Sequence, residues 1–385
     1  MYGSGLCDRT EKAILERKSD MKKLLALVLV AALLTPMTVS VLATNDTPST
    51  VVFNDEFNFQ YVERIDEDNR IIRTYEKEDK PMGAIAYGLR SLNSEENDRE
   101  RTKALLSDLG MGDDFIAELS DEDLDVYGES KSITGVVSYI KTDKDGNSTY
   151  VSEGDVSVCA PPSIEEDVII KDDGGGGSSF FTAEYEDSYM RLNYMVIDCA
   201  GEVYKFLINA EWLTMPFWRL TDSLGACSSS MTVEAGTRRG WYSYKEKIAT
   251  TFEYEENIIQ TDFSSSQFQQ AQGANGWYGS GVVFDLPADY SYVDRDDDGD
   301  VIYSSETSYS NFKIHYEFEG KIIYPDQTVN FNSVATYCHE IIGLSLSTGL
   351  SIGTSEVGVS IGLGFDYLYD VRRAEIPHSI QYKPE

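Results

Sequence analysis

KIHYEF, residues 313–318, sets the pattern for the second half of the chain. Tyr and Phe recur there among strand-forming residues, as in residues 206–208 (FLI) and 251–254 (TFEY). Aromatic and β-branched residues favour strands, and turn signals spaced by about 8–14 residues are typical of sandwiches. We therefore predict that residues 180–385 form a mainly β domain, an antiparallel β-sandwich or jelly roll.

Residues 44–172 predict a smaller α+β region in front of this domain. Short strand-like pieces flank residues 94–131, which carry helical signals. Ser94 and Ser120 are suited to cap helices, and Gly110 is suited to end the first one. The segment is expected to form a small helical hairpin.

A Gly/Ser run at residues 173–179 separates these two parts of the sequence. Four consecutive glycines, Gly174 to Gly177, are typical of a flexible linker or a long loop. We take this run as the predicted domain boundary.

Residues 21–43 have the three parts of a bacterial secretory signal. Lys22 and Lys23 precede an unbroken apolar run, and Ala43 ends a stretch that fits the cleavage rule. Residues 1–20 are then interpreted as a translated leader in front of the true start. The alternative is an uncleaved membrane anchor over residues 24–43, although that run is short for a spanning helix.

The charge of the chain limits its partners. There are 66 acidic and 32 basic residues, which gives a net charge of −34. Such a polyanion is repelled by nucleic acid phosphates and by anionic lipid surfaces, so nucleic acid is excluded as a partner. The same acidity suits a soluble extracellular protein.

Four cysteines follow the signal segment, and they permit two disulfides in an exported chain. They are Cys159, Cys199, Cys227 and Cys338. Three connectivities are possible, and Cys199–Cys227 is favoured because both flank one short segment. None of them forms a CxxC pair, so a thioredoxin-like or zinc-knuckle site has no support.

An acidic loop at residues 294–300 resembles the calcium-binding pattern DxDxDG. The candidate Ca²⁺ ligands are Asp294, Asp296, Asp298 and Asp300. Alternating carboxylates converge when such a loop coils tightly, and hard oxygen ligands select Ca²⁺. The pattern departs at the twelfth position, which is Ser305. A solvated hairpin tip is the alternative.

Residues 342–369 predict an amphipathic β-hairpin. Apolar residues alternate with Gly and Ser in both arms, and each arm is about long enough to cross a bilayer as a tilted strand. One interpretation is a membrane-inserting hairpin. The other is a sandwich hairpin with one face in the core.

Two aromatic residues are candidates for ligand binding. Trp277 and Tyr278 lie in the Gly-rich stretch GANGWYGSG, which we expect to be a loop that exposes them. Secreted β-sandwiches often stack sugars on such side chains, although a core position is the alternative.

Catalytic patterns are weak. The three histidines lie far apart, and the run that starts at His339-Glu340 lacks the second histidine of a zinc protease site. A GxSxG elbow and phosphate-binding fingerprints are also missing.

The stretch AEWLTMPFWRLTDSLG, residues 210–225, resembles secreted proteins of unknown function from Gram-positive bacteria. The resemblance implies export and a β-rich fold, and it brings no activity.

The sequence thus favours a secreted or surface binding protein over an enzyme. Its expected ligand is a glycan or an extracellular protein, with possible Ca²⁺ support. A membrane-acting protein that uses residues 342–369 is the first alternative, and a secreted glycan hydrolase is the second.

Overall fold

The computed structural model describes residues 49–77, 94–143, 147–156, 187–216, 219, 221–272, 277–296, 299–340, 350–355, 358–363, 369–375 and 380–384. All of these belong to one unit, Ser49–Glu385. The expected leader, the signal segment and the glycine run lie outside the described residues.

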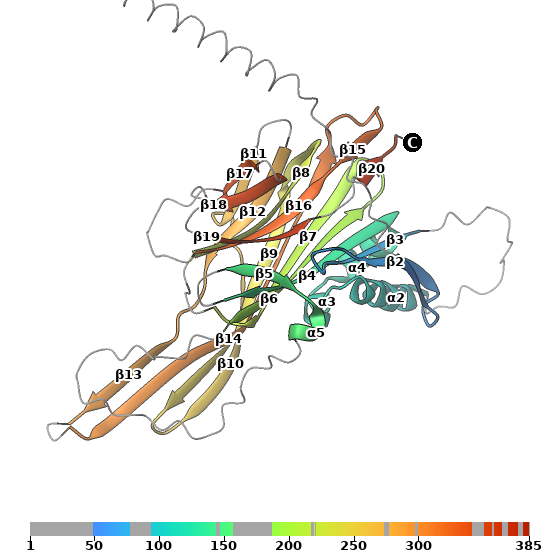
Figure 1. Ribbon diagram of the computed structural model, residues 1–385. Helices are drawn as coiled ribbons and strands as arrows, with labels where there is room; N and C mark the ends of the chain where they lie inside the picture. Colours follow the sequence, from blue (N-terminus) through green and yellow to red (C-terminus); the bar gives the residue numbers. More distant parts are fainter. Residues whose placement is uncertain are drawn as a thin grey trace, which may run out of the picture. The chain divides into compact units, whose positions relative to one another are not determined.

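An antiparallel sheet of 11 strands forms the centre of this unit (Figure 1). Its main path runs β1-β2-β3-β4-β6-β7-β14-β9-β10, while β5 pairs with β4 and β13 pairs with β14. The strands are β1 (Thr50–Asn54), β2 (Phe59–Ile65), β3 (Ile71–Glu76), β4 (Ser132–Thr142), β5 (Ser148–Val151), β6 (Ser188–Asp198), β7 (Val203–Thr214), β9 (Met231–Thr250), β10 (Tyr254–Asp262), β13 (Tyr290–Arg295) and β14 (Val301–Ile322).

A second sheet of five strands lies against the larger one, in the order β11-β12-β8-β16-β19. Its strands are β8 (Thr221–Ser229), β11 (Phe268–Gln272), β12 (Trp277–Asp285), β16 (Ser333–Glu340) and β19 (Tyr369–Glu375). Two ribbons accompany it, β15 (Val329–Phe331) with β20 (Ile380–Tyr382), and β17 (Leu350–Ser355) with β18 (Gly358–Leu363). The mainly β, antiparallel fold predicted from the sequence is confirmed.

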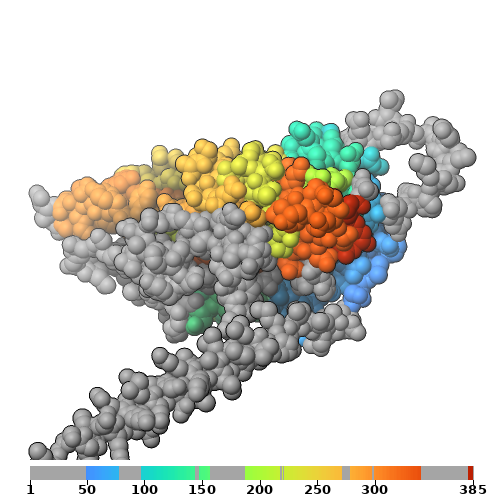
Figure 2. Space-filling model, turned by 90° about the horizontal axis from the view of Figure 1, so that it is seen from above, coloured from blue at the N-terminus to red at the C-terminus, as the bar shows by residue number. Residues whose placement is uncertain are grey.

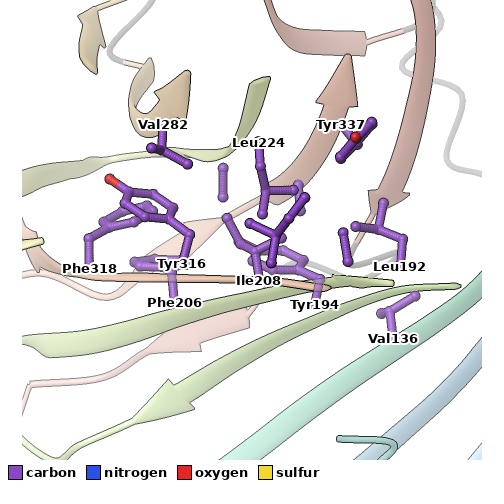
Figure 3. Packing of buried hydrophobic residues seen from close by; sticks show 14 of the residues in the cluster. Val136, Leu192, Tyr194, Phe206, Ile208, Leu224, Val282, Tyr316, Phe318 and Tyr337 are labelled. Atoms are coloured by element: carbon purple, nitrogen blue, oxygen red, sulfur yellow. The ribbon is translucent and has the colours of Figure 1, made fainter. Parts of the chain in front are cut away.

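The main core fills the space between the two sheets. In β14 every second residue from Phe312 to Phe318 is buried in it, because successive side chains of a strand point to opposite faces. Figure 3 shows Tyr316 and Phe206 of the larger sheet facing Val282 and Leu224 of the smaller one. Burying aromatic side chains of this size contributes about 1.5–3 kcal/mol each relative to exposure.

Helices cover the opposite face of the larger sheet, and three of them fall within residues 94–131, where the sequence predicted helices. They are α2 (Ser94–Asp108), α3 (Asp113–Ala117) and α4 (Asp121–Glu129), with the short α5 (Glu153–Val156) after β5. A second apolar cluster, which includes Leu106, Leu109 and Ile133, lies between helices and sheet. Gly110, at φ +101°, follows α2, and a Cβ there would lie 2.3 Å from a methyl carbon of Val137. Glycine is therefore required at this position, where the chain leaves α2 against the sheet.

The predicted division at residues 173–179 does not separate two sheets. Strand β4, from the first part of the sequence, pairs with β6, from the second, from Ser132–Asp198 to Thr142–Ser188. The helices pack on the face of that same shared sheet. The glycine-rich composition indicated a boundary there. Composition does not reveal which strands pair across such a connection.

Strands β9 and β14 are long enough to extend past the smaller sheet and form an arm with β10 and β13 (Figures 1 and 2). Several large apolar side chains are exposed on this arm, among them Ile258, Phe252, Tyr290 and Tyr292. The core between the sheets therefore does not extend over the whole length of these strands.

Candidate functional site

The acidic loop joins β13 to β14 at the end of the arm. Asp294 lies in β13 opposite Tyr303, and the Asp296 carboxylate accepts a 2.9 Å hydrogen bond from the Asp300 backbone N–H. Gly299, at φ +90°, supplies the turn. Asp298 lies outside the described residues. Among the residues that are described, no group of three or more acidic, histidine or cysteine side chains is placed to hold a metal, and the Ca²⁺ site stays a prediction.

Trp277 and Tyr278 do not lie in a loop, contrary to expectation. They begin strand β12, where they pair with Ser229 and Ser228 of β8. The Tyr278 side chain is half-buried. The stretch GANGWYGSG misled the prediction because its later glycines continue a central strand: Gly279 and Gly281 lie opposite Cys227 and Gly225 of the same neighbour.

The expected hairpin at residues 342–369 is described in part. Its strands β17 and β18 pair from Leu350–Leu363 to Ser355–Gly358. In this ribbon, β18 contacts β8 and β16, and β17 contacts β11 and β12, which are all strands of the smaller sheet. A position beside the smaller sheet is what the sandwich interpretation of the hairpin expects. Separately, no helix among the described residues is long and apolar enough to span a bilayer.

The favoured Cys199–Cys227 disulfide is not formed. Cys199 packs with the helix-side cluster, whereas Cys227 lies in the smaller sheet on the other side of the larger one. Two thiols on opposite faces of a sheet cannot reach the Cα separation that a disulfide needs, about 4.4–6.8 Å. Burial raises the pKa of the Cys199 thiol to about 11. Cys159 lies outside the described residues.

An ionic cluster lies between the larger sheet and α4, with buried acids and a half-exposed Arg239. Glu317 of β14 accepts hydrogen bonds from Arg239 of β9 and, at 3.0 Å, from the Tyr127 hydroxyl of α4. Lys205 of β7 lies 3.4 Å from an Asp123 oxygen and 3.7 Å from a Glu317 oxygen. Arg239 also pairs with Asp123. The cluster thus ties α4 to three strands.

The acids of this cluster stay ionised because cations surround them. Burial by itself would raise the pKa of Glu317, but the hydrogen bond and charge of His315, followed by the charges of Lys205 and Arg239, hold it far below its usual range. Burial and the nearby Glu317 raise the pKa of Tyr127 well above its usual value. Since every member has partners within the fold, the cluster is best understood as structural.

A second buried polar group lies near the end of β16, inside the sandwich. Asp222 of β8 accepts hydrogen bonds from the Tyr337 hydroxyl and, at 2.9 Å, from His339 Nδ1. Trp212 of β7 donates to the same Tyr337 hydroxyl at 2.9 Å. This arrangement joins the two sheets and fixes the imidazole. Sequence patterns could not indicate it, because Asp222 and His339 are 117 positions apart.

A polar pocket of about 280 Å³ opens where α2 and the α2–α3 turn meet β3, β4 and β6. Arg73 and Arg191 line it together with Asp113 and Glu153. The remaining lining residues are Ile71, Ser107, Gly110, Met111, Gly112, Val137 and Tyr139. It combines two cations, two anions and a small apolar patch.

Fixed contacts hold the pocket walls in place. Glu63 accepts a 2.7 Å bond from Arg73 Nε, and Arg191 Nη2 donates to the Gly110 carbonyl. The Tyr139 hydroxyl donates to Glu153 at 2.7 Å. Burial, followed by that bond to Glu153, raises the pKa of Tyr139 to about 12, so its hydroxyl stays neutral.

This pocket was not found from the sequence. Its residues come from five separate segments, and no spacing rule connects Arg73 with Arg191 before the sheet is known. From the sequence, Gly110 could be recognised as the end of a helix, but its place in the pocket wall could not. The signal that could have pointed to it is chemical: Arg191 lies in the run SYMRLNYMVID, where every residue except Arg191 and Asp198 is buried.

The comparisons with known proteins assign no family. No family model matches the chain, and no curated protein matches it. Fifteen chains of solved structures match. One comes from a structure titled "AvmM Catalyzes Macrocyclization in Alchivemycin A Biosynthesis", at 10% identity over 48% of this chain and 83% of that chain. Its TM-score of 0.21 is too low to support an argument about fold or function.

Proposed function

We propose that the chain is an exported binding protein that holds a glycan in the polar pocket between α2 and strands β3, β4 and β6. The observation that carries this proposal is the mixture of charged and apolar side chains that line the pocket. Guanidinium groups and carboxylates surround a small apolar patch formed by Ile71 and Val137. Ligand sites commonly combine a few placed polar groups with apolar surface, and a sugar offers hydroxyls to the first and C–H faces to the second.

The walls of this pocket suit recognition because they are pre-organised. Glu63 fixes Arg73, Glu153 fixes Tyr139, and the Gly110 carbonyl fixes Arg191. A ligand then loses less free energy to ordering of the side chains that hold it. Export is supported by the signal-like residues 21–43 and by the acidic composition.

Glycan-array binding followed by isothermal titration of the purified protein tests the binding site. The change Ser107→Trp places a large side chain at the exposed rim of the pocket, and we expect it to abolish binding. Glu100→Trp is the matched control, since Glu100 is exposed on the same helix and does not line the pocket. Binding that survives Ser107→Trp would remove the pocket from the proposal, and no glycan binding at all would refute the function.

N-terminal sequencing of the protein recovered from culture medium tests export. Cleavage after Ala43 makes Thr44 the first residue. Retention of residues 24–43 in the membrane fraction would instead support the anchored alternative.

A further inference from the structure

Arg191 stands out in the pocket because, in the described part of the chain, no carboxylate forms an ion pair with its guanidinium. Its Nη2 donates to the Gly110 carbonyl, and its buried Nε has no hydrogen-bond partner. Among the described residues, no acidic side chain forms an ion pair with it. Arg99, by contrast, pairs with two aspartates. The difference is notable in a chain whose acidic residues outnumber its basic residues by 66 to 32.

Arg191 is half-buried, and its Nε is removed from water. Burying part of a guanidinium without a counter-ion costs free energy, and an incoming anion offsets that cost. Arg73 adds to the effect from the neighbouring wall. Its Nε is bound by Glu63, and its Nη1 lies 3.6 Å from the point that a Cβ on Gly110 would occupy. Two guanidinium groups therefore line one pocket, and of these two, Arg73 alone has a carboxylate partner among the residues that the structure describes.

The two acids of the lining limit what kind of anion fits. Asp113 and Glu153 balance the two arginines in formal charge. They repel a dianionic phosphate about twice as strongly as a carboxylate, which carries a single negative charge. Planar carboxylates also match the fork of a guanidinium in two parallel hydrogen bonds.

We infer that the pocket recognises the carboxylate of an acidic sugar, with Arg191 as the group that binds it. The sugar hydroxyls would then donate to Asp113 and Glu153. This inference rests on the proposed glycan function and narrows it to glycans that contain uronic acid units.

Titration calorimetry with matched ligands tests it. The probes are an oligogalacturonate, the neutral galactose oligomer of the same length, and free galacturonic acid. We expect the oligogalacturonate to bind and the neutral oligomer to bind at least about 10-fold more weakly, since hydrogen bonds to charged groups are worth about one to two factors of ten. Arg191→Gln should remove this preference.

Arg101→Gln is the matched control variant. Arg101 is also half-buried and also donates to a backbone carbonyl, that of Phe57 at 3.1 Å, but it does not line the pocket. We expect no change of affinity in this variant. Thermal unfolding of both variants establishes that they are folded.

The outcomes distinguish failure of the carboxylate inference from failure of the proposed glycan-binding function. Equal binding of acidic and neutral oligomers, unaffected by Arg191→Gln, overturns the inference and leaves the glycan function standing. Arg191-dependent binding of the free acid without binding of either oligomer keeps carboxylate recognition and overturns the glycan function. No binding of any probe overturns both.

Discussion

Glu317 joins helix α4 to the larger sheet through a buried carboxylate. It is 1% exposed, and its carboxylate forms ion pairs with Arg239 and Lys205. It also accepts a hydrogen bond from the Tyr127 hydroxyl. Glu317→Gln keeps the shape but leaves the buried Lys205 with one acidic partner, and breaking a buried ion pair is strongly destabilising. We expect the free energy of unfolding in urea to fall by about 3 kcal/mol. Glu319→Gln, two residues along the same face, is the control and should change it by less than about 0.5 kcal/mol.

The pH dependence of stability follows from the same carboxyl. Because the pKa of Glu317 is lowered in the folded state, its contribution is present above the unfolded value of about 4.3. It is lost as the pH falls from there toward the folded pKa. The difference in unfolding free energy between the natural protein and Glu317→Gln should therefore shrink below about pH 4. A difference that stays constant from pH 7 to pH 3 would contradict the assignment.

At the scale of one element, helix α4 is held at its start by a capping box. Ser120 Oγ accepts from the Asp123 N–H at 3.2 Å and donates to the Asp123 carboxylate at 2.6 Å. Ser120→Ala removes both contacts and should cost about 1–2 kcal/mol in urea unfolding. Ser152→Ala is the control, because Ser152 makes the same contact with Asp155 on α5, a helix with no buried residue. Equal losses in the two variants would show that the box at α4 is not special.

Local sequence patterns predicted the ends of such helices well, but they could not predict contacts between distant segments. The cap at Ser120 and the stop at Gly110 were predictable because both depend on neighbours within a few residues. The pairing of β4 with β6 was not, because it crosses the segment whose glycines indicated a boundary. The pocket could not be predicted for the same reason. Arg73 and Arg191 come to line one pocket only after three strands have paired.

At the scale of the whole molecule, the larger sheet is shared by two cores, one under the helices and one under the smaller sheet. Unfolding of this shared sheet removes the surface on which both cores pack. The described layers should therefore unfold together, as small cooperative units do.

Hydrogen exchange measured by mass spectrometry through a urea titration tests this cooperativity. Peptides from α4 and from β8 report on the two outer layers, which contact opposite faces of the sheet. We expect both to become unprotected at the same urea midpoint and with the same free energy of opening. Loss of protection in α4 at clearly lower urea would show that the helical layer opens by itself. The Glu317→Gln variant then serves as a check on the coupling, because weakening the bonds between α4 and the sheet should shift both midpoints together if one sheet unites the two layers.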